Sequence, residues 1–191
     1  MKNVIQAGIT LFVLTFITTS LQAQPTFVLS DSSTMSITGT STLHDWESRV
    51  TEFSVDIKAN IDSETPSFRE FILTVPVESI KSEKSKMEKQ TYEALKEKDH
   101  PIITFDLLNV TSVEDDTVTA AGNLTIAGTT KPITIKAAYT PQTNKTLQLQ
   151  GAYSLKMTNY NVEPPSIMFG TIKSGDEVTI HYNFYITSNN L

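Results

Sequence analysis

Apolar side chains stand at every second position over most of this chain. From Phe53 to Ile61 the odd-numbered residues are apolar and the residues between them are polar. The same period of two recurs over residues 71–77, 103–107, 118–126, 133–139, 147–155 and 178–186, and Met35 and Ile37 mark an earlier segment. Successive side chains of a strand point to opposite faces, so the pattern predicts about eight or nine half-buried β-strands.

Short polar connections separate these segments. Asp115-Asp116, residues 128–132 and residues 141–145 each lie between two alternating segments. Connections of this length predict hairpins, so neighbouring strands should be antiparallel. Consecutive antiparallel strands form a sandwich or a barrel, and a closed barrel leaves no exposed edge. With about eight strands, a barrel either fills its interior with side chains or holds one small ligand.

One charged segment, residues 82–98, interrupts the alternation and predicts a helix. Ser85 followed by Glu88 indicates a capping box, with Ser82 as the alternative cap. Pro101 disfavours helical geometry at the residue before it and so ends the segment. Four residues form one narrow stripe at helical spacing on one face: Met87, Thr91, Ala94 and Leu95. We expect this helix to cover one end or one seam of the barrel.

Residues 1–23 are predicted to be a signal peptide that is cleaved near Ala23. Lys2 supplies a positive start, and residues 9–17 form a short apolar stretch. This stretch is too short for a transmembrane helix of about 20 residues, so we expect no stable membrane insertion. Residues 24–191 should then form one exported domain, periplasmic or secreted.

Composition narrows the class of protein further. The chain has 21 acidic and 15 basic residues and a net charge of −6, which disfavours nucleic acid and anionic membrane surfaces as partners. It contains no cysteine, so disulfides and thiolate chemistry are excluded. Because exported eukaryotic domains commonly use disulfides, the sequence favours a bacterial protein.

Residues 41–46 (STLHDW) contain the residue types of nucleophilic catalysis. Adjacent His44 and Asp45 would point to opposite faces of an extended segment, and no nucleophile elbow accompanies them. We interpret the segment as a turn or the beginning of a strand, with a local hydrogen bond to His44 and a satisfied Trp46 N–H. A ligand contact is the alternative. The histidines lack metal-ligand spacing, so we predict no enzyme, no metal and no cofactor.

Four stretches together resemble the YceI-like family. They are residues 41–46, residues 92–105 with His100-Pro101, residues 122–133 (GNLTIAGTTKPI) and residues 175–180 (GDEVTI). The order and spacing of the second and third stretches are the specific part, and the resemblance spans essentially the whole chain after residue 23. It implies a lipocalin-like antiparallel barrel through which a long isoprenoid chain, with a quinone as one candidate, is threaded. It implies no shared catalytic apparatus.

The inward side chains of the alternating segments are the predicted wall of a ligand site. An apolar wall suits such a ligand because each CH₂ group removed from water contributes about 0.8 kcal/mol. The predicted wall residues are Phe53, Val55, Ile57, Phe71, Leu73, Val75, Phe105, Leu107, Leu124, Ile126, Ile133, Ile135, Tyr153, Leu155, Ile180, Tyr182 and Phe184. The predicted lids, rich in adaptable methionine, are Met87, Tyr92, Leu95, Met157 and Met168.

The predicted function is therefore non-catalytic binding and transport of a long apolar isoprenoid-type lipid. The alternative is a structural or interaction β-sandwich with a solid core, at the cell surface or in the periplasm. The sequence leaves open the head group of the ligand and whether the barrel forms a homodimer.

Overall fold

The computed structural model describes residues 27–61, 65–143, 145–167 and 171–188, so the predicted signal peptide and Met168 lie outside it. The described residues form one α-helix, two 3₁₀ turns and twelve strands. The strands are β1 (Phe27–Leu29), β2 (Thr34–Ser41), β3 (Trp46–Val50), β4 (Ser54–Asn60), β5 (Ser67–Pro76), β6 (Ile80–Lys81), β7 (Ile102–Glu114), β8 (Thr117–Ile126), β9 (Thr129–Pro141), β10 (Thr146–Lys156), β11 (Ser166–Ile167) and β12 (Ile172–Ser188). The helix is α1 (Ser85–Ala94), and the 3₁₀ turns are η1 (Val77–Ser79) and η2 (Met157–Tyr160).

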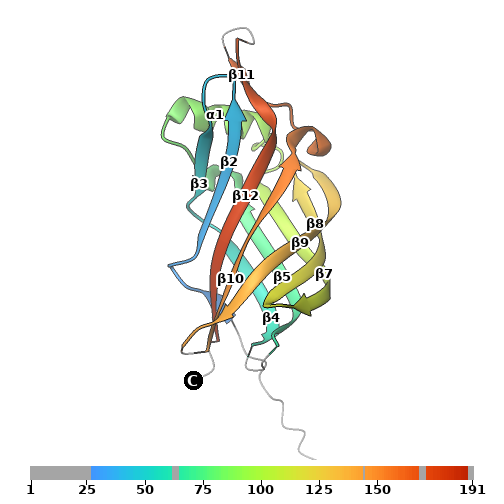
Figure 1. Cartoon of the computed structure of the whole chain (residues 1–191). Helices are drawn as coiled ribbons and strands as arrows, with labels where there is room; N and C mark the ends of the chain where they lie inside the picture. Colours follow the sequence, from blue (N-terminus) through green and yellow to red (C-terminus); the bar gives the residue numbers. More distant parts are fainter. Residues whose placement is uncertain (1–26, 62–64, 144, 168–170, 189–191) are drawn as a thin grey trace, which may run out of the picture.

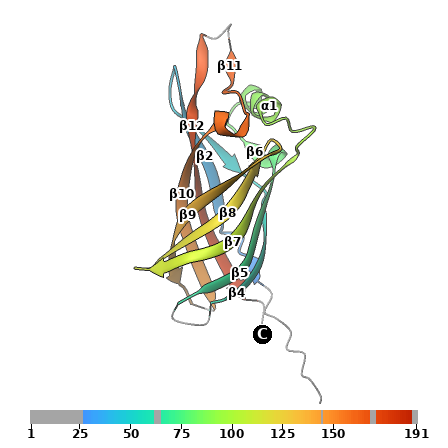
Figure 2. The ribbon, with the colours of Figure 1, turned by 90° about the vertical axis from the view of Figure 1, so that its right-hand side faces the viewer.

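All strands belong to one antiparallel sheet that curls into an elongated barrel (Figures 1 and 2). Hydrogen-bonded neighbours follow the order β4-β5-β7-β8-β9-β10-β12-β2-β3-β6. Short segments close it: β6 follows β5 across η1 and pairs with β3, while β1 pairs with β12 and lies beside β4. The predicted antiparallel barrel with one inserted helix is confirmed, and the alternative sandwich of two sheets is wrong.

The predicted number of strands is too low. Strands β1, β6 and β11 have only two or three residues, which is too short to produce an alternating pattern. Strand β3 (WESRV) was missed because it carries only a few apolar positions.

Two hairpins turn with two residues each. Asp115 and Asp116 have φ angles of 49° and 56°, and positive values at both positions are what a type I′ turn requires. Ala127 and Gly128, with φ angles of 47° and 76°, join β8 to β9. The predicted turn over residues 128–132 is therefore misplaced, because β9 already begins at Thr129.

Strands β9 and β10 pair only through residues 137–141 and 147–151. Before Ala137 on β9 and after Gly151 on β10 the two strands separate. There η2 lies against both of them and against β12 (Figure 1). Pro132 fits into β9 because only β8 pairs with the strand there. Tyr182 of β12 passes over Gly151 and donates its hydroxyl to the Lys136 carbonyl oxygen at 2.9 Å. The phenol thus satisfies a backbone acceptor beside the point where the β9–β10 pairing ends.

A glycine near the upper end of the barrel allows an aromatic ring to lie against the sheet. A Cβ atom at Gly39 of β2 would overlap the ring of Trp46, its paired residue on β3. The three nearest atoms to that position all belong to the Trp46 ring. The indole therefore occupies the space that a side chain at position 39 would need.

Helix α1 covers the upper end of the barrel (Figures 1 and 2). Its N-cap is Lys84, which makes no side-chain capping bond, so neither Ser85 nor Ser82 is the cap that the sequence predicts. Glu88 nevertheless reaches back, and its Oε1 accepts a hydrogen bond from the Ser82 N–H at 3.1 Å. No residue of α1 is fully buried, as expected for a helix that covers an opening.

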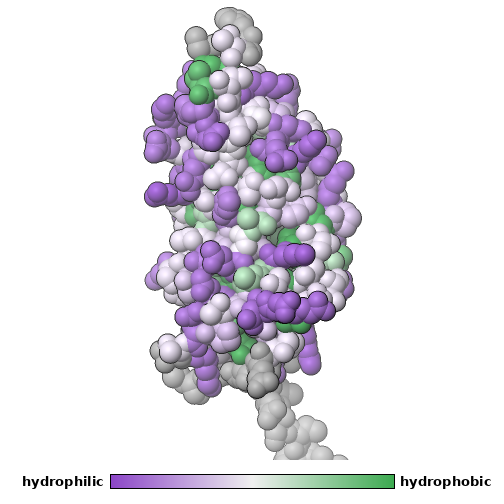
Figure 3. Space-filling model, in the orientation of Figure 1, coloured by the Kyte–Doolittle hydropathy of each residue, from purple (hydrophilic) through white to green (hydrophobic). Residues whose placement is uncertain are grey.

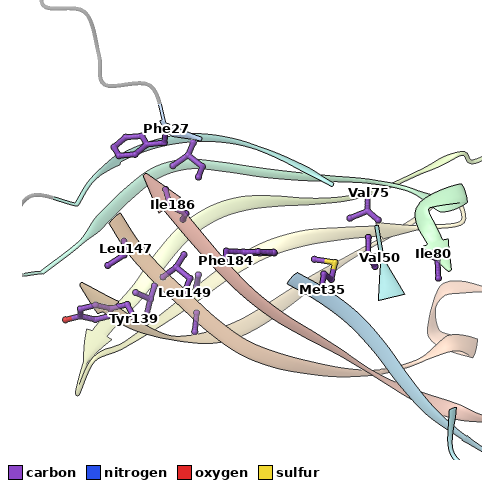
Figure 4. Packing of buried hydrophobic residues seen from close by; sticks show 14 residues of the cluster. Phe27, Met35, Val50, Val75, Ile80, Tyr139, Leu147, Leu149, Phe184 and Ile186 are labelled. Carbon is purple, nitrogen blue, oxygen red and sulfur yellow. The ribbon is translucent and has the colours of Figure 1, made fainter. Parts of the chain in front are cut away.

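The inward side chains meet inside the barrel, and the outward face is mostly polar. Ile186 and Leu147 are 0% and 2% exposed, and Phe184 packs with its ring centroid 5.5 Å from those of Tyr182 and Phe53. Figure 4 shows side chains from several strands converging on this interior. On the face shown in Figure 3, hydrophobic residues appear only as small separate areas among hydrophilic ones.

Replacing Gly39 by alanine should destabilise the fold by about 1–3 kcal/mol, because the added Cβ overlaps the Trp46 ring. Urea denaturation measures the loss in the free energy of unfolding. In a Trp46→Leu background the same substitution should cost clearly less, while Ala152→Ser on the exposed face of β10 should be neutral. An equal cost in both backgrounds would exclude the ring contact as the cause.

Replacing Tyr182 by phenylalanine should cost about 1 kcal/mol, because the Lys136 carbonyl oxygen loses its phenol donor. Tyr185→Phe on the same strand is the matched control and should have little effect. Thermal denaturation measures the stability of both variants. Equal stability of Tyr182→Phe and Tyr185→Phe would contradict the assigned role of the Tyr182 hydroxyl.

Candidate functional site

Two adjoining cavities occupy the inside of the barrel. The lower cavity measures about 100 Å³, lies between inward side chains of β2, β5, β7 to β10 and β12, and exposes only apolar atoms. The upper cavity measures about 390 Å³ and lies between α1, η2 and the upper ends of the strands. Ile180 of β12 lines both, so they meet at its level. The upper volume falls within the roughly 300–1,000 Å³ that small-molecule sites occupy.

Most of the predicted wall residues line one of these cavities. Those of the lower cavity are Phe71, Leu73, Phe105, Leu107, Leu124, Ile133, Ile135, Tyr153, Ile180, Tyr182 and Phe184. Those of the upper cavity are Ile126, Leu155 and again Ile180, together with the predicted lids Met87, Leu95 and Met157. The barrel therefore brings these residues together around one hollow, and their contact with a ligand stays a prediction.

Four predicted wall residues pack into the core and line neither cavity: Phe53, Val55, Ile57 and Val75. Three of them come from β4 or the residue before it, where the closing strand β1 lies alongside. Phe53 packs against Phe184 there. The interior at this corner is filled by side chains, which alternation alone does not reveal.

Tyr92 fastens the helix to the barrel and does not line a cavity. Its hydroxyl lies 2.9 Å from the Glu78 carbonyl oxygen and 3.1 Å from that of Ile80, and it accepts a hydrogen bond from Lys81 Nζ at 3.1 Å. The side chain thus holds α1 against η1 and β6. The last predicted lid, Met168, lies outside the described residues.

β-Bulges explain the wall residues that alternation misses. The pairing of β4 with β5 shifts between Lys58 and Ala59, which brings Phe68 to the same side as Phe71. Shifts in β7 leave Leu108 61% exposed and turn Val110 into the lower cavity. A bulge adds one residue to one strand and so reverses the phase of the pattern. The other missed residues of this cavity follow the alternation and could have been found from it: Met35, Val118, Ala120, Ala137 and Leu149.

Three tyrosines contribute neutral phenols to the wall. Burial raises the pKa of Tyr182 to about 12, and burial followed by repulsion from Tyr153 raises the pKa of Tyr160 to about 12. Burial also raises the pKa of Tyr153. All three stay uncharged at neutral pH, so the wall below the mouth carries no phenolate.

Residues 41–46 form part of the mouth of the upper cavity. Ser41 Oγ donates to the His44 carbonyl oxygen at 2.7 Å and accepts from its N–H. His44 Nδ1 donates to the Asp45 carbonyl oxygen at 2.7 Å, since a carbonyl can only accept. Trp46 Nε1 donates to the Thr40 carbonyl oxygen at 3.0 Å. The predicted turn with local hydrogen bonds is confirmed. His44 donates to the backbone carbonyl oxygen of Asp45, whereas a catalytic relay would need a hydrogen bond to the Asp45 carboxylate.

Several polar groups complete this mouth, and of these the sequence had indicated only residues 41–46, as an alternative ligand contact, and Thr91 of the helix stripe. They come from the β2–β3 connection, the first turns of α1 and β12: Ser41, His44, Lys84, Lys86, Gln90, Thr91 and Ser174. Lys84 and Lys86 do not belong to the stripe that the sequence predicts for this helix. A helical stripe model counts only apolar residues, so it gave no signal for them.

Neither a metal-binding cluster nor a membrane-spanning helix occurs within the described ranges. There, no group of three or more histidine, aspartate or glutamate side chains could hold a metal ion. Within the same ranges no helix is long and apolar enough to cross a membrane.

Solved structures share this fold at low sequence identity. BcnA of Burkholderia cenocepacia matches with a TM-score of 0.68 and 19% identity over 80% of this chain and 95% of its own. A polyisoprenoid binding domain from Saccharophagus degradans matches with a TM-score of 0.66 and 14% identity over 85% and 98%. The YCEI protein of Campylobacter jejuni matches with a TM-score of 0.63 and 15% identity over 75% and 85%. At these identities the likeness concerns the fold.

Sequence comparison gives the family. No curated protein matches the chain closely enough to be counted as a relative. Residues 21–186 match the YceI-like domain, which confirms the resemblance seen in the motifs. With the match covering most of the chain and the barrel shared with a YCEI protein, this protein belongs to the YceI-like family.

Proposed function

We propose that the barrel binds one long apolar lipid of the isoprenoid type, quinones included, and carries it through an aqueous compartment. The observation that carries this proposal is the pair of adjoining cavities, the lower with an entirely apolar exposed wall. The neighbour from Saccharophagus degradans, described as a polyisoprenoid binding domain, supports the isoprenoid class.

The energetics of the lower cavity favour an occupant. An unfilled core cavity costs about 24 cal/mol per Å³, which for about 100 Å³ amounts to roughly 2 kcal/mol. Water relieves little of this cost, because the apolar wall offers it no hydrogen-bond partner. A hydrocarbon chain would restore the missing contacts and gain about 0.8 kcal/mol for each CH₂ group transferred from water.

The contrast between the inside and the outside of the barrel supports the proposed transport. The wall of the lower cavity is apolar, while the face shown in Figure 3 is largely hydrophilic and the chain has a net charge of −6. A lipid enclosed in this way is shielded from water, and the acidic carrier is repelled by anionic bilayers. Together with the signal peptide expected at residues 1–23, this supports a carrier in the periplasm or outside a bacterial cell.

Native mass spectrometry of the full chain, purified under gentle conditions from a bacterial host, tests the proposal. We expect a mass above that of the polypeptide and, after solvent extraction, an isoprenoid-type lipid. Apo protein that also fails to bind an added polyprenol would overturn the proposal.

Filling the lower cavity should shorten the lipid that fits. Ala120 is 5% exposed and lines this cavity, so Ala120→Phe should exclude the end of a long chain. Loss of two buried CH₂ groups corresponds to about a tenfold weaker affinity. Titration with a long and a short polyprenol should show this loss for the long one only. Ala121→Phe on the outward side of β8 is the control, and an equal loss there would contradict the assignment.

A further inference from the structure

Strands β5 and β7 pair only at their upper ends. Register pairs join residues 72–76 of β5 to residues 102–106 of β7, and none within the described chain joins the rest of these two strands. Below these pairs β5 continues in register with β4 alone and β7 with β8 alone, and the two strands diverge toward the lower end (Figure 2). We call the interval between residues 67–71 and residues 107–114 the slit.

The lower cavity reaches the slit from inside. Phe68 and Phe71 of β5 line the cavity on one side of the slit. Leu107 and Val110 of β7 line it on the other side. All four side chains are half-buried, and Leu108, outside the cavity on the same strand, is 61% exposed. Apolar side chains therefore continue from the lower cavity to the outer surface at the slit.

The interruption between β9 and β10, by contrast, is sealed by η2, which lies against β9, β10 and β12. Thr158 donates its backbone N–H and its hydroxyl to the Asp176 carboxylate at 2.9 and 2.7 Å. Asn161 Nδ2 donates to Thr129 Oγ1 at 3.0 Å. Within the described ranges, no helix or 3₁₀ turn covers the slit between β5 and β7 in this way. The slit is therefore the part of the wall that the fold leaves without a cover of its own.

The irregularity of these strands disfavours a protein partner at the slit. Strand edges can pair with another chain, and natural proteins prevent this with bulges and charged side chains. The register of β7 with β8 shifts twice along this edge, after Leu107 and after Val110. Arg69 of β5 is exposed beside it. Because a bulge bends the strand and disrupts its row of backbone groups, the slit suits a hydrocarbon chain better than an added strand.

The two cavities are too small to enclose a long isoprenoid. An engineered cavity of about 150 Å³ binds one benzene molecule. On this scale the cavities of about 390 and 100 Å³ hold roughly twenty carbon atoms. Geranylgeraniol has this many, whereas undecaprenol has almost three times as many. The end of the longer chain therefore has to leave the barrel.

We propose that the slit between β5 and β7 is a lateral outlet through which the hydrocarbon end of a long isoprenoid leaves the barrel. This inference rests on the proposed lipid-binding function and adds the path that the tail of the ligand takes. Parting the strands at the slit breaks no register pair between them. The emerging chain passes between Phe68 and Val110 and over Leu108. The barrel thereby accepts chains of different lengths, because the excess length lies outside the cavities.

Photolabelling of the unaltered full chain locates the tail. Delipidated protein is loaded with undecaprenol that carries a diazirine at its hydrocarbon end, and the labelled residues are identified by peptide mass spectrometry. We expect labels on the exposed residues beside the slit, Arg69 and Leu108. The same group at the end of geranylgeraniol should label cavity residues only. Labels from the long probe that are confined to cavity residues, or that lie on α1, would overturn the proposal.

A charge at the outer rim of the slit tests the outlet by affinity. In Leu108→Glu the ratio of undecaprenol to geranylgeraniol affinity should fall about tenfold, which corresponds to the loss of two buried CH₂ groups. Position 108 is exposed, so the variant should fold. Ala152→Glu adds the same charge to the exposed face of β10 and should keep the wild-type ratio.

The outcomes separate the outlet from the proposed function. An unchanged ratio in Leu108→Glu, or an equal fall in Ala152→Glu, would overturn the outlet. If the wild type binds geranylgeraniol and rejects undecaprenol, the outlet is wrong while the lipid carrier stands. If it binds neither alcohol, the proposed function itself fails. Analytical ultracentrifugation covers strand pairing between two copies: a dimer of delipidated protein that Leu108→Glu abolishes would assign the slit to that contact and overturn the proposal.

Discussion

Closure of a single antiparallel sheet decides both where this protein is solid and where it is hollow. Strand β12 holds the barrel together, because it pairs with β10 from Thr187 to Glu177 and with β2 on its other side. At the lower end β1 joins the wall between β12 and β4, and Leu147 and Ile186 fill the narrow interior. Toward the upper end β9 and β10 separate beyond Ala137, and the interior widens. The depth of the cavity thus follows from where strand pairing begins and ends.

The upper closure depends on side chains, because strand pairing there is very short. Strands β3 and β6 share only two register pairs. Beyond them Ser48 Oγ and Ser82 Oγ are hydrogen bonded at 2.8 Å, and Ser79 Oγ donates to the Glu52 carbonyl oxygen at 2.8 Å. Ser48 and Ser79 are 2% and 4% exposed, so these bonds satisfy hydroxyls that would be costly to bury alone. The seam can therefore end early and leave room for α1 over the mouth.

Local patterns predict much of this fold, and long-range geometry accounts for what they miss. Alternation identified the long strands and most of the lower wall, since one face of each strand is buried. It could not find Phe68 or Val110, because bulges reverse its phase, nor show that Val55 and Ile57 meet a filled corner. The helix was visible in the sequence, but its cap was not, because Lys84 has no capping side chain. The charged mouth arises where the β2–β3 connection meets α1, and these segments are distant in sequence.

Two departures from favourable local chemistry lie at the upper end of the barrel. Lysines occupy the N-terminal turn of α1, Leu43 is 65% exposed in the β2–β3 connection, and both segments line the same cavity. A native sequence is expected to satisfy local rules except where a site requires otherwise. At the lower end, by contrast, Ile186 and Leu147 are buried. The difference fits a lower end that stabilises the fold and an upper end that serves the proposed ligand site.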